Sequence, residues 1–83
     1  MVSDSIHSIY LSRLGKRLRH LRRSKGLSQA QLAIDADMEI SQISRIERGI
    51  LNTSVGTLLQ IAQALEVDIS DLLPSSISNE KEG

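Results

Sequence analysis

The chain has 83 residues, of which 40% are hydrophobic and 24% charged, so we expect one globular domain rather than a disordered chain. It contains no cysteine, which excludes a disulfide framework, a thiolate nucleophile and a cysteine zinc site. The formal net charge is zero, but bases exceed acids by four over residues 1–55 and acids exceed bases by four over residues 56–83. This segregation predicts a basic face and an acidic face on one small domain.

The apolar spacing predicts helices throughout and no strand. Leucines recur at helical intervals from Leu11 to Leu21, which indicates a first helix from Ile6 or Tyr10 to about Lys25. Four more helices are expected: Gln29 to about Ala36, Ile40 to about Arg48, a fourth capped by Ser54, and a short fifth capped by Asp68. We therefore expect an N-terminal extension over residues 1–9, a helical domain over 10–74 and a polar, disordered tail over 75–83.

The central segment, residues 29–48, has the pattern of a helix-turn-helix. Two short helices that cross at a steep angle need a small residue at the crossing, here Ala33, and an apolar plug in the turn, here Met38. They also need buried apolar positions on both helices, and these are filled by Leu32, Ala36, Ile43 and Ile46. An ordinary helical hairpin needs some of the same residues, but not the whole set at this spacing.

Three segments, LRHLRRSKGLSQAQLA, ISQISRIERG and LLQIAQALEVDISDLL, resemble the Cro and phage-repressor (XRE-like) helix-turn-helix family. The resemblance runs from about Leu14 to Leu73. It implies an all-α fold, a compact five-helix bundle of the phage-repressor type, with a helix-turn-helix formed by the second and third helices. The chain departs from the usual family pattern at Asp37 and Glu66, where glycine is usual, and at Thr53, where proline is common. Aspartate tolerates the left-handed conformation of the turn at modest cost.

The second helix of such a motif enters the major groove with its N-terminal residues at base edges. Counting outward-facing positions predicts these base contacts: Ile40, Ser41, Gln42, Ser44 and Arg45. An arginine such as Arg45 can bind guanine through two hydrogen bonds, while Gln42 suits adenine and Ile40 suits a thymine methyl. Ile40 also has an alternative interpretation as a capping or packing residue.

The resemblance implies further roles for residues around this helix. Gln29, Arg48 and Asn52 occupy positions that contact DNA phosphates in the family, and basic residues of the first helix can add longer-range attraction. Arg22 and Glu47 occupy the positions of an internal ion pair that joins the first helix to the recognition helix. Two unrelated surface charges are the alternative for that pair.

Apolar residues left over after the core is filled predict a partner subunit. We expect a homodimer formed through the fifth helix, with Ile69, Leu72 and Leu73 at the interface, and the N-terminal segment as an alternative cover for the exposed apolar surface.

No enzymatic site is indicated. The two histidines, His7 and His20, lack acidic or cysteine companions at ligand spacing, so no metal or other cofactor is expected. No apolar run spans a bilayer and no signal peptide is evident, so we expect a cytoplasmic protein with no membrane partner and no small-molecule ligand. The sequence predicts a regulator that binds double-stranded DNA at an inverted-repeat operator, of the repressor or restriction–modification controller type. A protein-binding module, such as an antitoxin-like partner of another protein, is the rival hypothesis.

Overall fold

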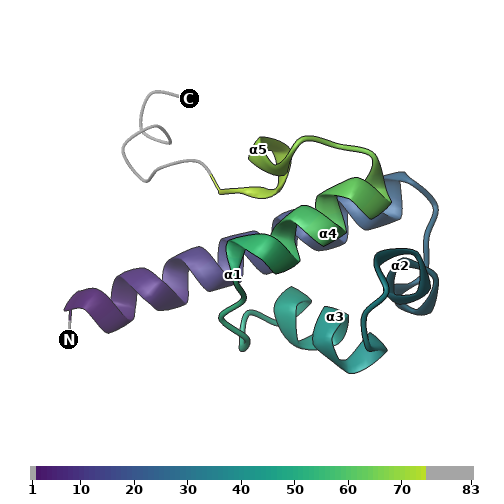
Figure 1. Ribbon diagram of the computed structural model, residues 1–83. Helices are drawn as coiled ribbons and strands as arrows, with labels where there is room; N and C mark the ends of the chain where they lie inside the picture. The colour runs from purple at the N-terminus through teal and green to yellow at the C-terminus, as the bar shows by residue number, and fades with distance from the viewer. Residues whose placement is uncertain (1, 75–83) are drawn as a thin grey trace.

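A computed structural model describes residues 2–74 as five helices, with no strand in that range. They are α1 (Val2–Ser24), α2 (Gln29–Ala36), α3 (Ile40–Glu47), α4 (Val55–Leu65) and α5 (Ile69–Leu72) (Figure 1). The predicted order and class of the elements are thereby confirmed. None of the helices within residues 2–74 is long and apolar enough to cross a bilayer.

The first helix begins earlier than the leucine spacing predicts. It starts at Val2, so the expected boundary between residues 9 and 10 falls inside α1, and the N-terminal turns of this helix project beyond the rest of the bundle (Figure 1). The leucine pattern stops at Leu11 because the turns before it have no core to cover. The tail predicted for residues 75–83 lies outside the described residues.

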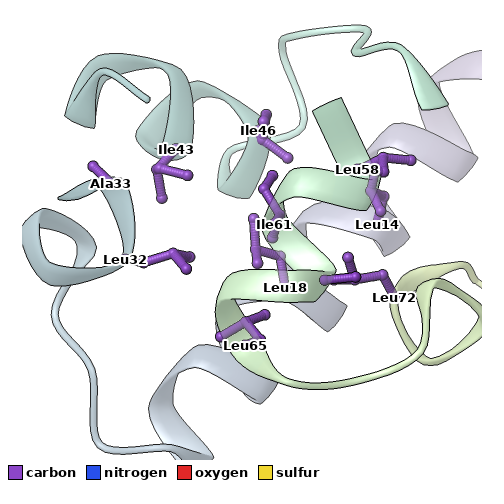
Figure 2. Packing of buried hydrophobic residues seen from close by; sticks show 11 residues of the cluster. Leu14, Leu18, Leu32, Ala33, Ile43, Ile46, Leu58, Ile61, Leu65 and Leu72 are labelled. Carbon is purple, nitrogen blue, oxygen red and sulfur yellow. The ribbon is translucent and has the colours of Figure 1, made fainter. Parts of the chain in front are cut away.

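The core draws apolar side chains from all five helices (Figure 2). Ala33 and Ile43 are buried where α2 meets α3, and Met38 packs against the cluster from the turn between them, as predicted. The remaining buried apolar residues include Leu14, Leu18, Leu32, Ala36, Ile46, Leu58, Ile61, Ala62, Leu65 and Leu72. Figure 1 shows α3 and α5 on opposite sides of the α1 and α4 helices, and α1 contacts both of them.

The position of Leu72 corrects one prediction. Its exposed fraction is 0%, because α5 folds back over α1 and α4 and inserts this side chain into the core. A fully buried side chain cannot form a subunit interface, so Leu72 is a core residue. Ile69 is half-buried against the same cluster, and Leu73 is exposed.

Four helices end in the same way, with one residue of positive φ that closes the last turn. Gly26 and Gly49 fill this position after α1 and α3, whereas Asp37 (φ 57°) and Glu66 (φ 61°) fill it after α2 and α4. After each of the last two residues, a backbone N–H bonds back five residues, Met38 to Ala33 and Val67 to Ala62. The two departures from the usual glycine therefore adopt the left-handed backbone that glycine prefers, at some cost in energy.

Gly15 lies where α1 passes closest to α3. A Cβ placed on it would lie 2.5 Å from the carbonyl oxygens of both Ile46 and Glu47. The absence of a side chain at Gly15 therefore sets the distance between α1 and the end of α3. Helix propensity alone counts this glycine as a mild cost and gives no sign of its role.

Candidate nucleic-acid interface

The helix α3 presents a polar stripe opposite its buried face. Ile43 and Ile46 are buried, whereas Ser41, Arg45 and Arg48 are exposed and Ser44 is half-buried. The spacing of these four polar residues, i, i+3, i+4 and i+7, is that of one helical face. Ile40, at the first turn, is 49% exposed. Of the five residues predicted to touch bases, the structure therefore places three on the open surface: Ile40, Ser41 and Arg45.

Gln42 is engaged within its own helix. Its side-chain oxygen accepts a hydrogen bond from the Glu39 N–H at 3.1 Å, which caps the start of α3, and the residue is half-buried. The predicted pairing with adenine uses both the donor and the acceptor of the amide. That pairing requires this cap to open, so the structure favours a capping role for Gln42. Glutamine three residues after the N-cap is the second half of the capping-box pattern, although Glu39 stands where serine or threonine is usual.

The start of α2 carries two backbone donors beside the same surface. Ser28 caps this helix by accepting from the Gln31 N–H at 3.0 Å, and the Gln31 side chain accepts from the Ser28 N–H at 3.2 Å. Within residues 2–74, the backbone N–H groups of Gln29 and Ala30 have no hydrogen-bond acceptor. Free N–H groups at a helix start suit an anion such as a phosphate.

A buried carboxylate, that of Glu47, fixes the positions of three helices. Arg22 of α1 binds it through two hydrogen bonds, from Nε to Oε2 at 2.6 Å and from Nη2 to Oε1 at 3.0 Å. Gln29 of α2 donates to Oε1 at 3.0 Å, and Arg19 donates to the same oxygen at 3.3 Å. The side chains of Glu47 and Arg22 are 0% and 8% exposed. The structure therefore brings the expected partners together as an internal ion pair.

The pKa values of the pair move apart. Burial alone would raise the pKa of Glu47, but the hydrogen bonds from Arg22 and Gln29 and the charge of Arg22 outweigh it and lower that pKa. The hydrogen bond to Glu47 raises the pKa of Arg22 further. Both groups are therefore charged at neutral pH. The network ties the end of α3 to the start of α2, so it holds the polar stripe of α3 in a fixed position relative to the free N–H groups.

The contacts of Arg19 and Gln29 were not predicted. For Gln29 the sequence predicts a phosphate contact, with simple helix-start chemistry as the alternative, and for Arg19 it predicts only longer-range attraction to DNA. The two residues lie 18 and 28 positions from Glu47 in the chain, so no local pattern indicates these hydrogen bonds. Gln29 contributes one amide hydrogen to the Glu47 network, and its side chain is half-buried.

The loop between α3 and α4 lies beside the projecting part of α1. Arg48 and Asn52 are both exposed, and Asn52 lines a small hollow of about 140 Å³ with His7, Tyr10 and Leu11. The N-terminal turns of α1 thus reach the loop in which a phosphate contact is expected. Helical periodicity could not reveal this neighbourhood, because it depends on where the loop passes in space.

Comparison with known proteins identifies relatives over most of the chain. A family model described as a helix-turn-helix domain matches residues 13–73. The chain is 42% identical over 60 residues to the control protein C.BamHI of Bacillus amyloliquefaciens, which covers 71% of this chain and 74% of that protein. It is 38% identical over 60 residues to the HTH-type transcriptional regulator SlrR of Bacillus subtilis, covering 71% of this chain but only 40% of SlrR.

A solved structure extends the similarity to the fold. The restriction–modification controller protein C.AhdI from Aeromonas hydrophila superposes with a TM-score of 0.75 at 40% sequence identity. The match covers 76% of this chain and 96% of that protein. Some of the longer regulators are matched over less than half of their length, as SlrR is.

Proposed function

Because the chain belongs to the helix-turn-helix family of DNA-binding transcriptional regulators, we propose that it acts as a homodimer that reads an inverted-repeat operator with α3 in the major groove. The observation that carries the proposal is the polar stripe of α3, whose N-terminal residues Ile40 and Ser41 stand clear of the bundle together with Arg45. Such a helix matches the width of the major groove and presents its side chains to base edges.

Phosphate contacts on both sides of α3 would fix the docking. At the start of α2, the free N–H groups of Gln29 and Ala30 suit one phosphate. Beyond the end of α3, the exposed Arg48 and Asn52 suit a second. The Glu47 network connects these two regions, so a single rigid unit would bind both phosphates and the bases between them.

The dimer would form through the exposed apolar residues of α4 and α5. Leu59 of α4 and Leu73, directly after α5, are each 46% exposed, and Ile69, the first residue of α5, is half-buried. Covering these side chains removes apolar surface from water, which favours association. A two-fold dimer would set the two copies of α3 about one helical turn of DNA, roughly 34 Å, apart.

Salt dependence of duplex binding tests the proposal directly. The logarithm of the affinity should fall linearly with the logarithm of the salt concentration, and the Arg48→Gln variant should lower the slope by about one unit. Lys25→Gln is the matched control: Lys25 is also exposed, but it lines a hollow with Ala64 and Glu66 at the far end of α4. If the salt slope fell in Lys25→Gln rather than in Arg48→Gln, the DNA would bind on another face.

A base-specific contact has a different signature from a phosphate contact. Removing the Arg45 side chain should cost about 1–3 kcal/mol on the preferred operator and relax the preference at one base pair. Titration of parent and Arg45→Ala with operators mutated one base pair at a time measures both effects. A uniform loss across all operators would reassign Arg45 to the phosphate backbone.

A further inference from the structure

An open hollow lies between α1 and α5, away from α3. Its volume is about 540 Å³, within the range of roughly 300–1,000 Å³ typical of small-molecule sites. Four residues of α1 and four from the α5 region line it: Arg13, Lys16, Arg17, His20, Ser70, Asp71, Leu73 and Pro74. The α1 residues lie in the segment from Arg13 to Lys25, which contains seven lysines and arginines and no acidic residue, and the proposed DNA surface does not use them.

Positive charge dominates this hollow. Lys16 and Arg17 are exposed, and among the lining residues only Asp71 carries a carboxylate. The Nε of Arg17 donates to the backbone oxygen of Asp71 at 2.6 Å, which ties α1 to α5. Within residues 2–74, no acceptor is bonded to the terminal nitrogens of Arg17 or to the Lys16 ammonium. These donors are therefore available to a ligand.

The hollow faces away from the proposed DNA surface. Gly15, Arg19 and Arg22 mark the side of α1 that contacts α3. At about 100° per residue, the stripe that lines the hollow is centred roughly 140° around the helix from that side. Figure 1 agrees, because α5 and α3 lie on opposite sides of α1. DNA bound along α3 would therefore not contact Lys16 or Arg17.

The lining combines anion recognition with an apolar wall. Lys16 and Arg17 can donate charge-assisted hydrogen bonds to phosphate oxygens, and the Ser70 hydroxyl can add another. Pro74 supplies apolar surface on the α5 side, against which a ring can pack; Leu73 also lines the hollow, but it belongs to the proposed dimer interface. We propose that this hollow binds a soluble phosphate monoester that carries a ring, of the chemical class of a nucleoside monophosphate. The proposal does not depend on the DNA-binding function.

Titration of the ¹⁵N-labelled full chain, without DNA, tests the site. Adenosine 5′-monophosphate at millimolar concentration should shift the amide signals of Lys16, Arg17, Ser70 and Asp71, and leave Ser41 and Arg45 unchanged. Adenosine, which lacks the phosphate, should cause no shift at these positions. Inorganic phosphate should bind more weakly than adenosine 5′-monophosphate, because it has no ring to pack against the apolar wall.

Variants with opposite expected effects sharpen the test. Lys16→Gln removes one exposed cation and should weaken binding about tenfold, the effect of losing one charge-assisted hydrogen bond. Asp71→Asn removes the competing carboxylate but keeps the backbone oxygen that holds Arg17, so binding should become a few fold tighter. Lys25→Gln, an equal change of charge outside the hollow, should leave the affinity unchanged. Thermal melts of all three variants without ligand confirm that each is folded.

Several results would overturn the proposal. Shifts confined to the start of α2 or to α3 would mean that the anion occupies the DNA surface. If adenosine bound as tightly as adenosine 5′-monophosphate, the hollow would not recognise the phosphate. If inorganic phosphate bound as tightly, the hollow would not recognise the ring. Shifts at Lys16 and Ser70 on adding a short duplex of arbitrary sequence would assign the hollow to nucleic acid instead.

Discussion

Replacement of Gly15 by alanine separates two opposed contributions to stability. Alanine in a helix interior is favoured over glycine by up to about 1 kcal/mol, so helix propensity predicts a more stable protein. The structure predicts the reverse, because the new Cβ would lie 2.5 Å from two backbone oxygens of α3 and 2.8 Å from the Glu47 carbonyl carbon. Ordinary van der Waals contact begins near 3.4 Å, so α1 and α3 would have to separate by about 0.9 Å.

Backbone atoms cannot rotate away as a flexible side chain can, so the cost should lie toward the upper end of the roughly 1–3 kcal/mol typical of overpacking. After subtraction of the propensity gain, Gly15→Ala should destabilise the domain by about 2 kcal/mol. The same displacement would strain the Arg22–Glu47 pair, whose closest hydrogen bond is 2.6 Å. Duplex affinity should therefore fall as well.

Urea unfolding followed by circular dichroism measures the effect, and Gly56→Ala is the matched control. Gly56 also lies in a helix, but a Cβ there would meet only the Ser54 hydroxyl oxygen, at 3.8 Å. That variant should gain about 0.5 kcal/mol. If Gly15→Ala were stabilised as much as Gly56→Ala, the close approach of α1 to α3 would be wrong.

Four further variants test stability and assembly. Because folding lowers the Glu47 pKa, its carboxylate stabilises the fold above its ordinary pKa of 4.5, and this stability is lost as the pH falls through the lowered folded-state value. The Glu47→Gln variant should lose about 3 kcal/mol of unfolding free energy at neutral pH, because Arg22 is left unpaired. In thermal melts from pH 7 to pH 3, its stability should fall less steeply than that of the parent. Parallel stability curves for the two proteins would contradict the role of the pair. Glu66→Gly should stabilise by about 1 kcal/mol in urea unfolding, since glycine removes the strain at φ 61°, and a loss of stability would refute this. The Leu72→Ala variant should lose about 2–5 kcal/mol of unfolding free energy, because this side chain is fully buried. The Leu73→Asp variant should keep its fold but sediment as a monomer in analytical ultracentrifugation. A dimer that survives Leu73→Asp would place the interface elsewhere.

Much of the fold follows from the sequence because local signals agree with it. A serine precedes α2 and α4, at Ser28 and Ser54, and a glycine follows α1 and α3, at Gly26 and Gly49, so these helix ends carry local signals that agree with the structure. The predicted start of α1 is wrong, because an exposed helical turn needs no apolar pattern. Leu72 was placed wrongly for a different reason: four residues of helix are too few to show which face turns inward.

The sequence likewise predicts one part of the candidate site and not the other. The outward stripe of α3 follows from period alone, so Ser41 and Arg45 could be predicted from the sequence. The Arg22–Glu47 pair was foreseen only through the family resemblance, and the bonds from Arg19 and Gln29 to the same carboxylate were missed. Contacts between side chains far apart in the sequence depend on how helices cross, and no local pattern records that.

Selection of bound duplexes from a random DNA pool by the purified protein, near physiological salt, tests whether α3 reads DNA. If it does so in a two-fold dimer, an inverted repeat whose half-sites lie about one turn, roughly 10 base pairs, apart should be enriched. The Arg45→Ala variant should lose the preference at one position of each half-site. Recovery of no sequence above background would contradict the assignment of α3 as a reader of DNA, and would favour the rival hypothesis of a protein-binding module.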